Sequence, residues 1–167
     1  MQAGQAGAET QHALYDPTTT LADGSPRPAD DDRESWRAHW VKVGQPWRRE
    51  PEIVLGQQRN LAQTIARSRA PGGDPTPFRG TTLTRADVEW LLAHHDDGCG
   101  PVDWSDPAQR ARVGLDLRGA YLKDLDLSGL PLARTRGGPT IAEWQELGGR
   151  DPYLPSPQAD TWRIHLG

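Results

Sequence analysis

The side chains with the most chemical potential lie together in one short run of the chain. Residues 94–99 contain two histidines, two aspartates and the single cysteine of the sequence, namely His94, His95, Asp96, Asp97 and Cys99. These are zinc and transition-metal ligands, so the run could serve a metal-dependent hydrolase. The spacing weakens that hypothesis, because adjacent side chains on a helix point about 100° apart and cannot easily reach one ion. The sequence also holds no second ligand cluster, such as Cys-x-x-Cys, that would complete a metal site.

The same run has a simpler interpretation as the polar end of a helix. Histidine near a helix C-terminus complements the helix dipole, and Gly98 can end the helix. A third alternative pairs His94 as a base with Cys99 as a nucleophile, but no group that would orient the base is evident. We therefore expect a protein that is not an enzyme, with no catalytic residue, metal or cofactor.

A helix over about 84–95 must position this cluster. Thr84 with Asp87 three residues later has the pattern of a capping box, and Val88, Leu91 and Leu92 provide an apolar stripe. Other helices are expected over about 51–69, 106–112 and 141–147, each with a start signal such as proline in the first turn or a capping residue.

The helix over 51–69 contributes a nucleic-acid hypothesis. Its arginines at 59, 67 and 69 could contact phosphates, so binding through Arg48–Arg69 is a further alternative function. No recognition motif accompanies them, and the net charge of the chain is −4. Nucleic-acid-binding domains are usually basic, so composition does not favour nucleic acid as a partner.

Three tryptophans, Trp36, Trp40 and Trp47, precede this helix. Trp36 and Trp40 are four residues apart and could share one helix face. Such large apolar rings need a place to pack, so this arm either lies across the core or forms an exposed patch for a partner. Residues 1–34 are polar and acidic, and we predict a disordered tail there.

The length suits one small domain over 35–167. A single cysteine excludes an internal disulfide and suits a reducing compartment. The first residues lack the basic and apolar regions of a signal peptide, and no apolar run is long enough to span a membrane. We therefore expect a cytoplasmic protein without a membrane partner.

A five-residue repeat dominates the C-terminal half. Leucine recurs at Leu117, Leu122, Leu127 and Leu132, and the residues two positions earlier are Leu115, Ala120, Leu125 and Leu130. Neither a helix nor an ordinary strand has a period of five, so the pattern indicates a special architecture. We expect these eight residues to form a structural repeat core.

This segment resembles the pentapeptide-repeat proteins, whose unit is written A(D/N)LXX. Asp116 and Asp126 fill the acidic position and Ala120 fills the alanine position. In that family, four units complete one coil of a right-handed quadrilateral β-helix. The resemblance therefore implies an α+β fold, with one coil over about 115–134 flanked and capped by short helices. From Pro46-Trp47-Arg48 onwards the arrangement resembles the N-terminal region of larger bacterial pentapeptide-repeat proteins.

These observations predict a helical cap over about 46–112, a repeat coil over 115–134, and a helix and loop over 139–167. One coil cannot bury both of its own ends, because repeat architectures need several stacked units and distinct caps. We therefore expect a non-enzymatic interaction or scaffold module, or the N-terminal cap of a longer repeat protein. Its partner would be another protein, or a second copy bound through the open coil face.

Overall fold

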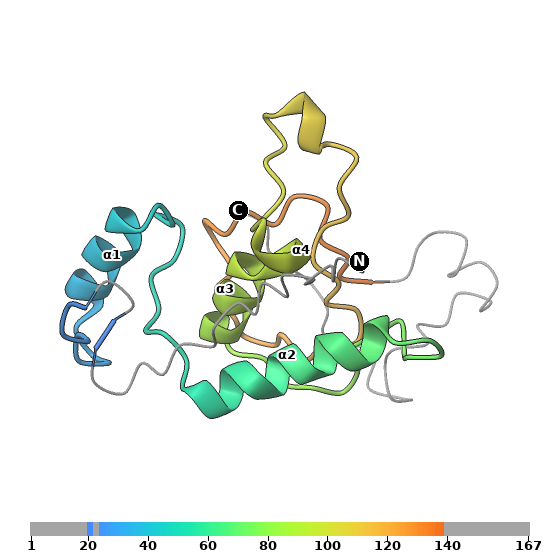
Figure 1. The fold of residues 1–167 in the computed structure, drawn as a ribbon, viewed down its shortest axis with the longest axis horizontal. Coiled ribbons are helices and arrows are strands. Elements are labelled where there is room, and N and C mark those ends of the chain that lie inside the picture. The colour runs from blue at the N-terminus through green and yellow to red at the C-terminus, as the bar shows by residue number, and fades with distance from the viewer. Residues whose placement is uncertain (1–19, 22–23, 139–167) are drawn as a thin grey trace, which may run out of the picture.

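The computed structural model describes residues 20–21 and 24–138. Most of the predicted N-terminal tail and the predicted helix over 141–147 lie outside these residues. The elements in chain order are α1 (Arg33–Lys42), α2 (Leu55–Arg69), α3 (Arg85–Ala93), the single turn α4 (His95–Gly98) and the 3-10 turn η1 (Pro107–Gln109). Figure 1 shows α3 near the centre, with α2 along one edge and α1 to one side.

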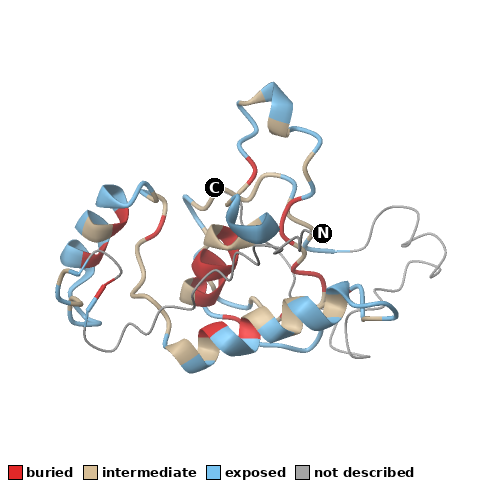
Figure 2. Ribbon diagram, viewed as in Figure 1, coloured by how far each residue is buried: buried red, intermediate tan, exposed pale blue. Residues whose placement is uncertain are grey.

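Helix α3 forms the centre of the core. It begins with the predicted capping box, in which the Thr84 side chain accepts from the Asp87 N–H and the Asp87 carboxylate accepts from the Thr84 N–H at 2.8 Å. Seven of its nine residues are buried, as the red segment in Figure 2 shows. The core around it joins three parts of the chain, namely Leu61 from α2, Phe78 and Leu83 from the intervening loop, and Leu115, Leu117 and Ala120 from the repeat.

Helix α2 begins at Leu55, four residues later than Pro51, where the sequence predicted its start. The preceding segment is held outside the helix by contacts with other parts of the chain. The Trp40 indole donates to the Glu50 carbonyl at 2.9 Å, and the backbone N–H of Glu50 donates to the Glu89 carboxylate at 3.0 Å. Tertiary hydrogen bonds therefore replace the first predicted helical turn.

The prediction of a β-helix coil over 115–134 is wrong. The described part of the chain contains no β-strand, and it has only three isolated bridges, one of them outside the repeat. A β-helix needs ladders of successive backbone pairs between neighbouring passes. Here the repeat makes one parallel bridge from Tyr121 to Thr82 and one from Asp116 to Arg136.

The five-residue period is instead a period of tight turns. Within each unit, the residue three positions after the periodic leucine donates its N–H to that leucine's carbonyl, at 3.1–3.3 Å: Ala120, Leu125, Leu130 and Thr135. The residue before each donor has positive φ, in the order Gly119, Asp124, Gly129 and Arg134. A left-handed residue at the third position is typical of a type II turn. The repeat is therefore a series of corners, each closed by one of these backbone bonds.

Burial decreases along the repeat. Leu115, Leu117 and Ala120 are buried in the core, whereas the later inward positions are only partly buried: Leu122, Leu125, Leu127, Leu130 and Leu132. Four of these five pack against the core cluster, the exception being Leu125. The first corner is therefore the anchor of the repeat, and the later corners lie at the margin of the core.

Buried arginines tie the repeat to the rest of the chain. Arg118 binds the Asp116 carboxylate, with an Nη2–Oδ2 distance of 2.7 Å, and donates to the Pro75 carbonyl at 3.0 Å. Arg85 donates to the carbonyls of Asp126 and Ser128. Buried charges are tolerated when they are paired and hydrogen-bonded in this way.

None of the helices within the described ranges is both long enough and apolar enough to cross a membrane.

Candidate interaction surface

The segment from Gly100 to Gly114, here called the projecting loop, extends away from the body of the molecule. Figure 1 shows it as the yellow loop at the top, with η1 near its far end. The two ends of the loop lie next to α4 and to the start of the repeat, so its position is set by both.

The base of the projecting loop is closed by side-chain bonds. Arg112 donates to the Gly100 carbonyl at 2.9 Å and to the Asp96 carboxylate at 3.0 Å. His95 Nε2 lies 2.8 Å from the Val113 carbonyl. These contacts join the segment that enters the projecting loop to the segment that returns from it, so the base of the loop is closed.

The far end of the loop is also organised. The Asp103 carboxylate accepts from the Ser105 hydroxyl at 2.6 Å and from the Ser105 N–H at 2.9 Å. These two bonds, the hydroxyl first, lower the pKa of Asp103 below its ordinary value. Asp106 then caps η1 by accepting from the Ala108 N–H at 2.9 Å. Both aspartates thus form turns at this end of the loop by accepting hydrogen bonds from backbone N–H groups.

Trp104 stands at this organised end with 52% of its surface exposed. Its carbonyl accepts from Arg110 Nε at 3.2 Å, and the Arg110 guanidinium lies 5.8 Å from the indole centroid. The other large hydrophobic residues exposed among the described positions are four valines. An exposed tryptophan is a much larger contact surface than a valine, and tryptophan dominates many protein interfaces.

The tryptophans proposed as a partner surface are located elsewhere. Trp36 has 0% exposure and Trp40 has 4%, and they stack on each other with ring centroids 5.5 Å apart. Leu21 completes this small cluster, and Arg48 lies 3.6 Å above the Trp40 ring. Trp47 is half-buried against the main core. The structure therefore favours packing of this arm over an exposed aromatic patch.

The residues of the His94–Cys99 run do not converge on one point. His94 stacks on Trp90 and lies 2.9 Å from its carbonyl. His95 contacts the projecting loop, while Asp96 and Asp97 pair with different arginines, Arg112 of that loop and Arg69 of α2.

Backbone geometry explains this divergence. Asp96 and Asp97 both have left-handed φ angles, 53° and 56°, which redirect the chain after α3. Cys99 is exposed. No group of three His, Cys, Asp or Glu side chains suited to a metal ion exists among the residues that the structure describes. The metal-dependent hydrolase hypothesis therefore gains no support from the geometry.

The arginines of the Arg48–Arg69 segment separate into two groups. Arg48 is buried and paired with Glu52 at 2.9 Å, and Arg49 pairs with Asp126. The arginines of α2 are exposed. Only the second group is available to a large ligand.

Sequence reasoning missed Trp104, although a signal was present. The run Asp103-Trp104-Ser105-Asp106-Pro107 places an aromatic residue among four strong turn formers. Turn segments usually lie at the surface, so a tryptophan inside one is a candidate for exposure.

Comparison of the chain with protein-family profiles, curated proteins and solved structures finds no match.

Proposed function

We propose that the protein is a non-enzymatic interaction module, and that the projecting loop is its partner-binding element. The observation that carries this proposal is the half-exposed Trp104 on a loop whose base and far end are both hydrogen-bonded. Binding a partner costs conformational entropy, and a loop that is already ordered reduces that cost. Tryptophan is among the residues most enriched in binding hot spots.

The sequence resemblance to pentapeptide-repeat proteins is in keeping with this proposal, because in that family the repeat is a scaffold. The left-handed residue at every fifth position, from Gly119 to Arg134, accounts for the spacing without any β-ladder. We infer that the repeat acts here as a support. It anchors one end of the projecting loop, at Gly114, against the core.

Affinity capture from an extract of the source organism tests this proposal. Three immobilised full-length baits are compared by quantitative mass spectrometry: the wild type, Trp104→Ala, and Val54→Ala as a control that removes another exposed apolar side chain. We expect one or more proteins to be retained by the wild type and by Val54→Ala but not by Trp104→Ala.

The expected weakening for Trp104→Ala is about 2 kcal/mol or more, which corresponds to about 30-fold in Kd. Retention of the same proteins by all three baits would refute the assignment of Trp104. Light scattering of the purified chain distinguishes a second copy from a different protein, because self-association through the loop would also be lost in Trp104→Ala.

A further inference from the structure

The outer face of α2 has a charge pattern that the projecting loop does not explain. Residues 53–73 contain no aspartate or glutamate, but they contain Arg59, Arg67 and Arg69. This stretch therefore carries a formal charge of +3 within a chain whose net charge is −4. Such a local excess of positive charge on one element attracts polyanions.

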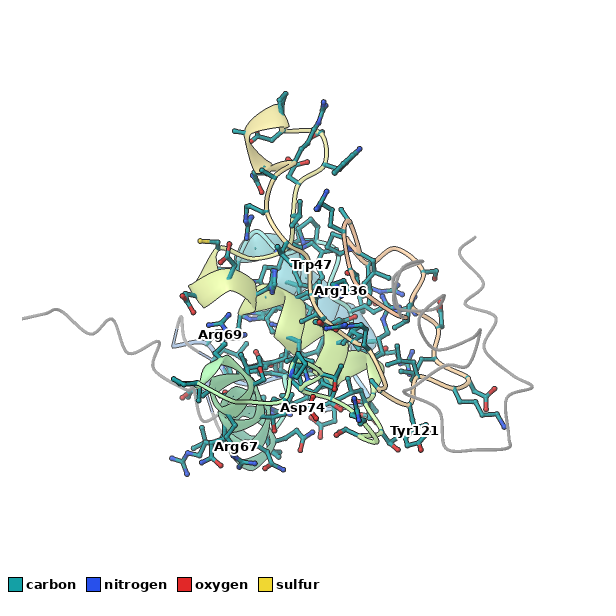
Figure 3. All side chains as sticks on the ribbon, turned by 90° about the vertical axis from the view of Figure 1, so that its right-hand side faces the viewer. Trp47, Arg67, Arg69, Asp74, Tyr121 and Arg136 are labelled. Carbon is teal, nitrogen blue, oxygen red and sulfur yellow. The ribbon has the colours of Figure 1, made fainter. Side chains whose placement is uncertain are left out.

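Burial shows that these arginines share the open side of the helix. Helix α2 turns Gln58 and Leu61 inward. Its exposed residues recur with the period of a helix: Gly56, Arg59, Asn60, Gln63, Ala66, Arg67 and Arg69. Figure 2 shows α2 along the edge of the molecule with exposed, intermediate and buried residues alternating along it, and Figure 3 shows Arg67 on the side of α2 that faces away from α3.

The existing partners of these arginines are weak competitors for a ligand. Arg69 forms an ion pair with Asp97 at 2.7 Å, but both side chains are more than half exposed. Exposed ion pairs of this kind contribute little to stability. Arg67 contacts the Gln63 amide oxygen at a long 3.4 Å, which holds the guanidinium on the helix surface without neutralising it.

We propose that the exposed face of α2 binds double-stranded DNA by lying in the major groove. An α-helix is about 10–12 Å wide with its side chains, and the major groove is about 12 Å wide. Arg59 and Arg67 are separated by about 12 Å along the helix axis, from a rise of 1.5 Å per residue. Both can therefore reach phosphates while the amides of Asn60 and Gln63 lie between them.

The same face fits an acidic protein less well. The central part of a protein interface is apolar and rich in aromatic residues. The exposed positions of α2 carry arginines, amides, glycine and alanine, with no large apolar side chain. Arginine, asparagine and glutamine are the side chains that bond to base edges and phosphates. The composition of the face therefore favours nucleic acid.

Fluorescence anisotropy with a labelled 20-base-pair duplex tests the proposal on the full chain. If three arginines contact phosphates, the slope of log K against log salt is about −2.7. Affinity then falls about 40-fold between 50 and 200 mM salt. The Arg59→Gln/Arg67→Gln double variant should weaken binding and reduce the slope to about −0.9.

A charge-matched control separates this face from a general charge effect. Arg33→Gln/Arg37→Gln removes the same charge from exposed positions of α1 and should leave affinity and slope unchanged. Absence of binding at 50 mM salt overturns the proposal. So does equal weakening by both double variants, or stronger competition by polyglutamate than by unlabelled duplex. Trp104→Ala should bind the duplex like the wild type, so this proposal and the proposed function fail independently.

Discussion

Replacing Glu89 by alanine should be among the most destabilising single changes in this protein. The Glu89 side chain has 0% exposure and accepts three bonds. One oxygen accepts from the backbone N–H groups of Arg49 and Glu50 at 3.1 and 3.0 Å, and the other accepts from Arg85 Nε at 2.8 Å. The carboxylate therefore links α3 to the segment before α2.

The expected loss in the free energy of unfolding follows from the groups that would lose their partner in Glu89→Ala. Arg85 would remain buried without its carboxylate, and breaking one partner of a buried pair costs about 3–5 kcal/mol. Two partly buried backbone N–H groups, those of Arg49 and Glu50, would also lose their acceptor, at about 1 kcal/mol each, the low end of the range of about 1–3 kcal/mol for fully buried groups. These terms overlap and do not add, so we expect a loss of about 4–6 kcal/mol. That is a large fraction of the 5–15 kcal/mol typical of a folded domain.

Urea unfolding followed by tryptophan fluorescence measures this loss, with Glu34→Ala as the control. Glu34 is exposed in the first turn of α1, so its removal should cost less than about 1 kcal/mol. In a double-mutant cycle, adding Arg85→Met should recover part of the loss, because the uncompensated charge is then gone. A Glu89→Ala protein within about 1 kcal/mol of the wild type would refute this reasoning.

Three further changes test the repeat and the central helix. In Gly114→Ala, the new Cβ would lie 2.4 Å from the Arg134 carbonyl oxygen, so a marked fall in Tm is expected in a thermal melt. The pKa of Asp126 is lowered, first by the Ser128 hydroxyl, so its stabilising effect is present at neutral pH and is lost as the pH falls below about 4. The fall in Tm between pH 7 and pH 3 should therefore be smaller in Asp126→Asn. Thr84→Ala removes the capping box of α3 and should cost about 1 kcal/mol in urea unfolding.

Matched comparisons make these tests specific. Gly129→Ala introduces a Cβ into open space at φ +73°, so it should cost only the left-handed penalty of about 1–2 kcal/mol. If Gly114→Ala is no less stable than Gly129→Ala, the predicted clash between the new Cβ at position 114 and the Arg134 carbonyl is refuted. Asp124→Asn serves as the second control for pH dependence, since this residue is exposed in the same repeat. An Asp126→Asn protein with the full wild-type response to acid would exclude a contribution from Asp126.

Local sequence signals were sufficient for several elements. The capping box at Thr84 and Asp87 correctly placed the start of α3, because both partners lie within one helical turn. The arginines before Pro71 correctly placed the end of α2. The five-residue period also corresponds to a real structural unit, since every fifth residue from Gly119 to Arg134 adopts a left-handed conformation.

Other outcomes depended on contacts between distant segments. A period of five is compatible with the coil of a β-helix and with a series of separate turns. A β-ladder forms only where neighbouring passes of the chain pair over several successive residues. The described chain supplies single bridges there, so the β-helix prediction was wrong. Likewise, Trp36 and Trp104 are the same residue type in polar surroundings. Trp36 is buried in a small cluster with Leu21 and Trp40, whereas Trp104 is half-exposed on the projecting loop.

The buried charges also show this difference between what local sequence predicts and what tertiary contacts decide. Arg85 and Glu89 are four residues apart, a spacing that the sequence shares with ordinary surface pairs on helices. Their burial is decided by the repeat and the segment before α2, which pack over α3 and accept or donate the remaining bonds. The sequence by itself therefore determined where the local helical and turn signals lie. Tertiary structure decided which polar and aromatic side chains hold the fold together and which remain available to a partner, because burial depends on what covers a residue.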